Sequence, residues 1–488
     1  MLRRDPFRVI NCCVRLEFFL LLFIYFILIL SLSFLFSKRM KSLEDFFLAS
    51  RNLPRSLVYL SLCASWFGAT SILVSTDEAF THGISAFWVM GIPATLTVLL
   101  LGFFLARPIR RLPIVTLPDL VELRYGRLVR HLASLLIVWY MVVLASSQMV
   151  AIGNFLKTFL GSSYLLSLAL GTVVVLIYSI FGGFFSVALT DGLQFFLLSA
   201  GCISLFIFLF DASSFKEIPV LASQLGRPDY FNFLFGFKKN FLIALSFTLA
   251  WTISPIAWQR IQAAKTDRNA KQGLFAASGT FILLYGLLLF TGILSLPIFL
   301  SKNMESPLFS ELISSKVGFF LGGVLFVAIV AAVMSTMDTA INTGALSITR
   351  DVYQQIFPSG RKKRVISMSR LATFLVGALA FLVATKFQSI LKTLGLASEI
   401  MAEGLFVPGM AMIFLKKKLP AAGFLSLTLG GGFSVVSFLC EAELLRFNWP
   451  SWPFSVPYGL ALSLFGFLVG FFIEKYRKRQ GLDSSVEI

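Results

Sequence analysis

The sequence predicts an all-α polytopic membrane protein with about thirteen transmembrane helices, because apolar runs long enough to cross a bilayer recur throughout. Mean hydropathy is +0.86, and only 14% of the 488 residues are charged. Soluble domains carry about 25% charged residues. No stretch is long or polar enough to indicate a separate soluble domain.

The expected spans cover residues 17–36, 56–80, 84–107, 131–158, 162–181, 190–210, 240–259, 273–300, 316–345, 366–386, 393–415, 420–440 and 455–474. The first run has no small-residue cleavage site after it, which favours a retained span over a signal peptide. The spans divide the chain into a flanking helix with a cytoplasmic loop (1–55), five helices (56–210), five more (240–415), and two flanking helices with a cytoplasmic tail (416–488).

The net charge of +18 is interpreted as membrane topology. Most of the basic residues lie in alternate connections between the expected spans, which is the positive-inside pattern. Nucleic acid is therefore not an expected partner, whereas a lipid bilayer is.

Two expected spans contain helix-breaking residues, and each of these spans opens one group of five. Gly68 in SLCASWFGATS weakens the span 56–80, and Pro255 in FTLAWTISPIAW removes a backbone donor from the span 240–259. Broken helices at bilayer depth are tolerated where they line a cavity or pack against protein. An ordinary kink in each helix is the alternative.

A polar cluster lies in AAVMSTMDTAINTGALSITRDVY, at 331–353. On a helix, Ala332, Ser335 and Thr336 share one face. Two hydroxyls and a main-chain carbonyl one turn back are neutral oxygens, which suit a weakly held monovalent cation. The alternative is that both hydroxyls bond to carbonyls four residues earlier, as is common in membrane helices.

This stretch resembles the signature of the sodium:solute symporter family, which includes bacterial proline, pantothenate and sugar symporters. Other stretches resemble family segments in the same order: DFFLASRNLP (45–54), TLPDLVELRYG (116–126), GGFFSVALTDGLQ (182–194), QRIQAAKTDRNAKQG (259–273) and, more weakly, FVPGMAMIFLKK (406–417). The resemblance implies the LeuT-type fold, in which two inverted five-helix repeats form the core and further helices flank it.

The resemblance also implies a sodium site. In the family, this site takes oxygens from the eighth core helix and carbonyls from the unwound first core helix. Ala332, Ser335 and Thr336 match the first group by position, and Ala64 and Phe67 match the carbonyl donors.

Three further carboxylates are singled out. Asp191 in TDGLQ resembles a residue linked to sodium-dependent transport in the family, and a helix N-cap is the alternative role. Glu399 and Glu403 lie one turn apart in the span 393–415. A carboxylate at bilayer depth costs about 2.5–3.5 kcal/mol and is functional by default. Glu403 lies deeper, and we expect it to contact a substrate ammonium or to bind a proton.

The expected solute contacts are Thr70, Ser71, Trp251 and Ser254, beside the two helix breaks. Sugar-carrying members of the family have an acidic and an amide residue where this chain has Thr70 and Ser71, which argues against a sugar. Proline carriers place an acidic residue near Trp66, which argues against proline.

The predicted function is sodium-coupled symport of a small polar organic solute, such as an amino acid or organic acid, by alternating access in the cell (inner or plasma) membrane. The alternatives are a proton-coupled or sodium-independent carrier of the same fold, using Glu403 or Asp191, and a non-transporting membrane sensor. The chain has two histidines, and its five cysteines show no metal-ligand spacing, so no metal centre built from histidine or cysteine is expected. Neither an enzyme nor a cofactor is expected, and sodium is the expected coupling ion.

Overall fold

The structure is a computed structural model. It describes residues 18, 20–27, 31, 51–112, 114–212, 215–299, 306–357, 362–415 and 417–480. The side chains at 178, 181–191, 193, 211, 212, 362 and 363 lie outside that description. The described chain is helical, and it holds one isolated β-bridge, between Leu53 and Ala264.

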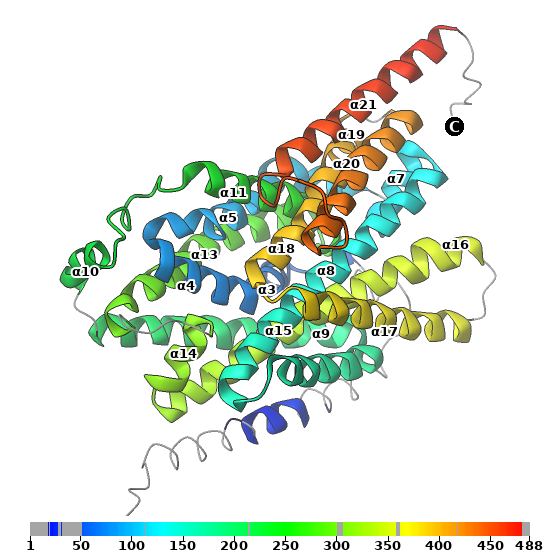
Figure 1. The fold of residues 1–488 in the computed structure, drawn as a ribbon. Coiled ribbons are helices and arrows are strands. Elements are labelled where there is room, and N and C mark those ends of the chain that lie inside the picture. Colours follow the sequence, from blue (N-terminus) through cyan, green and yellow to red (C-terminus); the bar gives the residue numbers. More distant parts are fainter. Residues whose placement is uncertain are drawn as a thin grey trace, which may run out of the picture.

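The first half of the chain contains α3 (Arg55–Trp66), α4 (Ala69–His82), α5 (Gly91–Leu100), α6 (Ala106–Arg111), α7 (Leu117–Tyr125), α8 (Arg127–Leu160) and α9 (Tyr164–Ala212). The second half contains α10 (Ile218–Gln224), α11 (Phe237–Thr252), α12 (Pro255–Ala263), α13 (Asp267–Leu294), α14 (Leu308–Ser315), α15 (Phe319–Leu346), α16 (Gln354–Ile356), α17 (Lys362–Lys386), α18 (Ile390–Glu399), α19 (Phe406–Phe414), α20 (Pro420–Glu441) and α21 (Val456–Arg479). In Figure 1, α19, α20 and α21 lie together on one side of the bundle, and α10 and α14 lie on the opposite side.

Eight helices of the described chain are long and apolar enough to cross a membrane, and up to ten if each bent pair is one span. The differences from the expected spans are local. The span 17–36 falls largely outside the described residues, and 56–80 is divided at Phe67 and Gly68. The second part of 56–80 continues through 84–107 as one candidate span, Ala69–Arg111.

α9 also differs from the prediction. It is one helix of 49 residues and covers both expected spans 162–181 and 190–210. The intervening sequence FGGFFSVALT contains two glycines but no proline. Every residue there retains its N–H, so helical hydrogen bonding can continue.

The centre of the bundle is formed by α8 and α15, together with α9. The apolar window of α8 is 78% buried, whereas that of the outer helix α17 is only 28% buried. Phe326 on α15 packs against Phe155 and Phe159 on α8, with ring centroids 5.5 and 4.8 Å apart. Aromatic packing therefore holds the first, apolar part of α15 against α8.

Candidate sodium and solute site

The first predicted helix break is present between α3 and α4. α3 ends at Trp66 and α4 begins at Ala69, with Gly68 in an extended conformation between them. The carbonyls in the last turn of a helix have no partner within that helix, and Ala64 lies in that turn. Phe67 packs its ring against Phe195 and Tyr285. Its side chain is thus occupied by packing, and what it can offer an ion is its main-chain oxygen.

The second predicted break is present between α11 and α12, which are bent by 44°. Pro255 is the first residue of α12 and Ser254 precedes it as the N-cap residue. Proline suits this position because the first N–H groups of a helix have no helical acceptor. The Trp258 indole N–H donates to the Thr252 carbonyl at 2.9 Å, so one of the carbonyls at the end of α11 has a partner.

The polar face of α15 lies against the first break. Thr336 Oγ donates to the Ala332 carbonyl at 3.1 Å, as the alternative for this residue predicted. A Cβ built on Gly68 would be 2.7 Å from Thr336 Oγ and 3.9 Å from the Ala332 oxygen. Glycine therefore allows the chain break to approach α15 closely.

The residues predicted to bind sodium come from these two segments. Ala64, Ala332, Ser335 and Thr336 are all buried, with exposed fractions between 5% and 7%. The hydrogen bond from Thr336 uses its proton and leaves the lone pairs of its oxygen available. A carbonyl-rich helix end that faces the Thr336 hydroxyl is an arrangement of neutral oxygens that can hold an alkali ion and release it.

A cavity lies beside both breaks. Its walls include the four expected contacts Thr70, Ser71, Trp251 and Ser254, and Thr336 also reaches it. Ser71 donates to the Trp66 carbonyl at 2.9 Å and accepts from the Tyr285 hydroxyl at 3.0 Å. Trp251 stacks on Phe247, with ring centroids 5.0 Å apart. The cavity thus has aromatic walls with a few placed hydroxyls, which is typical of small-molecule sites.

Three residues that the sequence reasoning did not select also line the cavity: Tyr140, Gln148 and Arg260. Gln148 donates to Thr70 at 3.1 Å, and no described residue donates to its Oε1. Arg260 donates to the Ile256 carbonyl at 3.2 Å, and it is the one charged residue among the cavity walls of the described chain. An amide inside the apolar run of α8 was the signal that could have identified Gln148.

Glu403 does not line this cavity. It belongs to a π-helical segment, η7 (Ile400–Leu405), and its carboxyl lies against Gly459 of α21. The predicted contact with a solute ammonium therefore has no support in this structure. Helical periodicity predicted which face of its helix carries Glu403. It could not predict that α21 covers that face.

Asp191 lies within α9, and its side chain is outside the described part of the structure. The N-cap alternative does not hold, because the helix continues on both sides of this residue. Its link to sodium stays a prediction.

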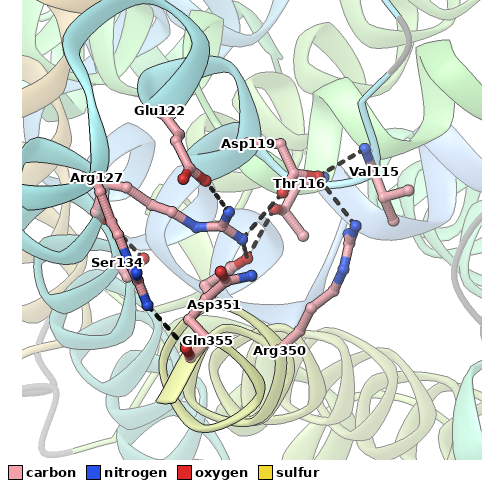
Figure 2. A network of polar contacts seen from close by, with 10 residues as sticks. Val115, Thr116, Asp119, Glu122, Arg127, Ser134, Arg350, Asp351 and Gln355 are labelled. Atoms are coloured by element: carbon pink, nitrogen blue, oxygen red, sulfur yellow. Dashed lines mark hydrogen bonds and ion pairs between the residues drawn. The ribbon is translucent and has the colours of Figure 1, made fainter. Parts of the chain in front are cut away.

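A second polar centre lies where α7, α8 and the end of the α15 segment meet, and we call it the Arg130 cluster: Thr116, Asp119, Glu122, Arg130, Arg350 and Asp351. Arg130 is within 3.0 Å of Asp119 and 3.1 Å of Asp351, and it also pairs with Glu122. Figure 2 shows Thr116, Asp119 and Glu122 facing Asp351 across this junction.

The local sequence explains how the cluster is positioned. Thr116 and Asp119 form a capping box at the start of α7, so the Asp119 carboxylate is fixed by backbone N–H groups. Arg350 donates to the same Asp119 carboxylate, with the two atoms 3.1 Å apart. It belongs to η6 (Ser347–Tyr353), a π-helical continuation of α15. The polar end of the signature stretch thus joins the loop before α7 to α15.

Tyr125 is the last residue of α7, at the end opposite to the capping box and outside the candidate spans. Its hydroxyl donates to the Pro408 carbonyl of α19 at 2.7 Å. Burial raises the pKa of this phenol, so it remains a hydrogen-bond donor at physiological pH.

Asp338 is another buried carboxylate that the prediction left without a role. It is fully buried on α15 and accepts from Ser179 of α9 and from Asn342 at 2.5 Å. A carboxylate inside an apolar helix was a visible signal, but its partner on α9 was not.

Comparisons with known proteins agree with this architecture. The sequence model of the sodium:solute symporter family matches residues 46–431. The sodium/pantothenate symporter of Escherichia coli is 26% identical over 479 residues, which cover 94% of this chain and 96% of that protein. An osmoregulated proline transporter of Bacillus subtilis is 26% identical, with 76% and 78% covered. The sodium/glucose cotransporter of Vibrio parahaemolyticus is also 26% identical, with 77% and 75% covered.

Solved structures show the same fold. A Na+-coupled sialic acid symporter in an outward-open state matches with a TM-score of 0.75 at 17% identity, covering 92% of this chain and 96% of that one. A nucleobase-cation-symport-1 family transporter in a closed conformation matches with a TM-score of 0.53 at 13% identity, covering 89% and 95%. The predicted LeuT-type fold is thereby confirmed.

Proposed function

The chain belongs to the sodium:solute symporter family, and from this premise we propose that it couples the entry of sodium to the uptake of a small polar organic solute. It is a multi-pass membrane protein and a member of a transporter family rather than of an enzyme family. The membrane we propose is the cell (inner or plasma) membrane.

The observation that carries this proposal is the close approach of Gly68 to Thr336 and Ala332. It supports a sodium site formed by the carbonyls of Ala64 and Phe67 and the polar face of α15. A bound ion there would hold the α3–α4 break against α15. If the ion binds the outward-facing state more tightly, it shifts the population toward that state.

The solute would bind in the adjacent cavity, beside Thr70, Ser71, Trp251 and Ser254. Hydroxyls and the Gln148 amide can hydrogen-bond a polar solute, and the indole rings can cover its apolar part. The Arg260 guanidinium in the cavity wall favours a solute with a carboxylate. An amino acid or organic acid fits these groups better than a neutral sugar, and one relative is named a sodium/pantothenate symporter.

The energy available from sodium is sufficient for uptake. One ion crossing about 100 mV gains about 2.3 kcal/mol, and a tenfold gradient adds about 1.4 kcal/mol. Together they support roughly 500-fold accumulation of a neutral solute per ion.

The test is the sodium dependence of uptake in proteoliposomes. Candidate solutes are first selected by thermal shift with and without sodium. Ser335→Ala and Thr336→Ala should each raise the sodium concentration for half-maximal uptake about tenfold or more, because each removes one oxygen ligand. Thr343→Ala is the matched control. Like Thr336, Thr343 lies on α15 and donates its hydroxyl to the carbonyl four residues earlier, that of Thr339, but it does not line the cavity.

Unchanged sodium dependence in both variants would remove these residues from the mechanism. Equal uptake of the solute in sodium and in choline buffer would contradict sodium coupling altogether and favour the proton-coupled or sodium-independent carrier.

A further inference from the structure

We propose that Glu399 and Glu403 together form a buried proton-binding site between α18–η7 and the flanking helices α20 and α21. This site is separate from the solute cavity and does not depend on the proposed sodium coupling. Its ligand is a proton shared between two carboxyl groups, and its effect is to make the packing of α20 and α21 on the core dependent on pH.

The two side chains lie on one face of the same helical segment, four residues apart. Both are fully buried, with exposed fractions of 0%. The Glu399 carboxyl accepts from Ser437 of α20 at 3.3 Å and from Ser455, the residue before α21. Glu399 is therefore positioned by hydroxyl donors from both flanking helices.

Glu403 has a different environment. Neither of its carboxyl oxygens has a hydrogen-bond partner in the described structure. A Cβ at Gly459 would overlap the Glu403 carboxyl, and a Cβ at Gly430 would overlap the Glu403 carbonyl. Gly459 of α21 thus forms a notch for the Glu403 carboxyl group, and Gly430 of α20 allows close approach to the Glu403 main chain.

The charges around the pair are acidic. The negative charge of Glu399 would repel that of Glu403, and the negative charge of Glu441 on α20 would repel that of Glu399. Lys392 of α18 is directed to Glu441, with Nζ and Oε2 2.6 Å apart. No salt bridge in the described structure includes Glu399 or Glu403.

The other elements that pack on this segment do not bring a cation to it. α8, α11, α19 and α21 contact η7. Their charged residues lie near the ends of those helices: Arg127, Arg130, His131 and Lys157 on α8, Lys238 and Lys239 on α11, and Glu474, Lys475, Arg477, Lys478 and Arg479 on α21. α19 has no charged residue. α4 packs on α18, and its ionisable residues are Asp77, which accepts from the Leu308 N–H, and Glu78, which pairs with His82.

Electrostatics then requires a proton at this site. Two ionised carboxylates in a dry pocket would repel each other and would each lose their hydration. One proton removes the repulsion and supplies the donor that the Glu403 oxygens lack. The carboxyl groups bind this proton while α20 and α21 are packed, and they release it when water reaches the notch.

The first experiment measures the thermal midpoint of the purified full-length protein in detergent as a function of pH, at constant sodium. The packed state holds a proton that the unfolded state releases, so stability should fall as pH rises. The Glu399→Gln/Glu403→Gln double variant should lose this component of the pH dependence. Glu443→Gln is the control and should keep it, because Glu443 is exposed and pairs with Lys386 rather than acting on Glu399 or Glu403.

The second experiment detects the proton directly. The infrared spectrum of the wild-type protein at neutral pH should show the carbonyl band of a protonated carboxylic acid in an apolar environment, and Glu403→Gln should reduce this band. Identical pH profiles in wild type and double variant, or a band unaffected by Glu403→Gln, would overturn the proposal. Loss of the band on adding sodium at fixed pH would also overturn it, because the pair would then be a cation site.

Discussion

The Arg130 cluster and the Glu399–Glu403 pair are both buried groups of charged residues, but they differ in composition. The cluster contains two guanidinium groups among three carboxylates, and each carboxylate has a basic partner. The pair contains two carboxylates, and the described structure supplies only hydroxyl donors to one of them. In the cluster, carboxylates paired with arginines join α7, α8 and the end of α15. In the pair, the carboxylates have no basic partner and, on our proposal, bind a proton instead.

The largest expected effect comes from removing the central cation. Arg130→Met should lower the free energy of unfolding by about 3–5 kcal/mol, because Asp351 would be left as a buried charge without its arginine. Thermal midpoints and the folded fraction after purification measure this. The Glu399→Gln/Glu403→Gln double variant should show no comparable loss at neutral pH. A similar loss of stability in Arg130→Met and in the double variant would mean that the Arg130 cluster and the Glu399–Glu403 pair stabilise the fold in the same way.

Asp351→Asn should cost less, about 1.5–3 kcal/mol, since it removes a charge-assisted hydrogen bond but keeps an acceptor for Thr116. Combining it with Arg130→Met gives a double-mutant cycle. The two losses should be strongly non-additive, because the residues are in direct contact at 3.1 Å. Additive losses would show that the cluster does not act as a unit.

Gly459→Ala tests the notch around Glu403. The added methyl should destabilise the protein by about 1–3 kcal/mol through overpacking. Gly432→Ala on α20 is the matched control, because a Cβ there meets no atom within 4 Å. Adding Glu403→Ala should restore much of the stability that Gly459→Ala removes. No restoration would place the strain elsewhere than at the Glu403 carboxyl.

The smallest effect is expected at an exposed ion pair. Lys386 and Glu443 are 3.7 Å apart and have exposed fractions of 51% and 81%. Glu443→Gln should change the stability by no more than about 0.5 kcal/mol, since solvent screens such pairs. A loss of stability as large as that expected for Asp351→Asn would contradict the idea that burial makes a charged pair matter for stability.

The spans were largely predictable because membrane helices depend on hydropathy, which is a property of the local sequence. Both helix breaks were also predictable, since Gly68 and Pro255 act through their own backbones. The exception is α9, where a glycine-containing stretch without proline continues as helix. Boundaries between adjacent apolar runs depend on packing as well as on composition.

For the candidate site, the sequence predicted the faces that carry chemistry. Thr70, Ser71, Trp251 and Ser254 line the cavity as expected. Gln148 and Arg260 were missed, and Glu403 does not line this cavity. The surroundings of each residue depend on which helix lies opposite.

The sequence by itself determined that this is a helical membrane protein, where two of its helices break, and which residues share a face with Ser335 and Thr336. Only the tertiary structure decided that Arg130 meets Asp351 and that Glu403 faces Gly459. Hydropathy and helical periodicity act over one or two turns, whereas the partner of a buried charge comes from a distant segment. The packing of whole helices brings that segment into place.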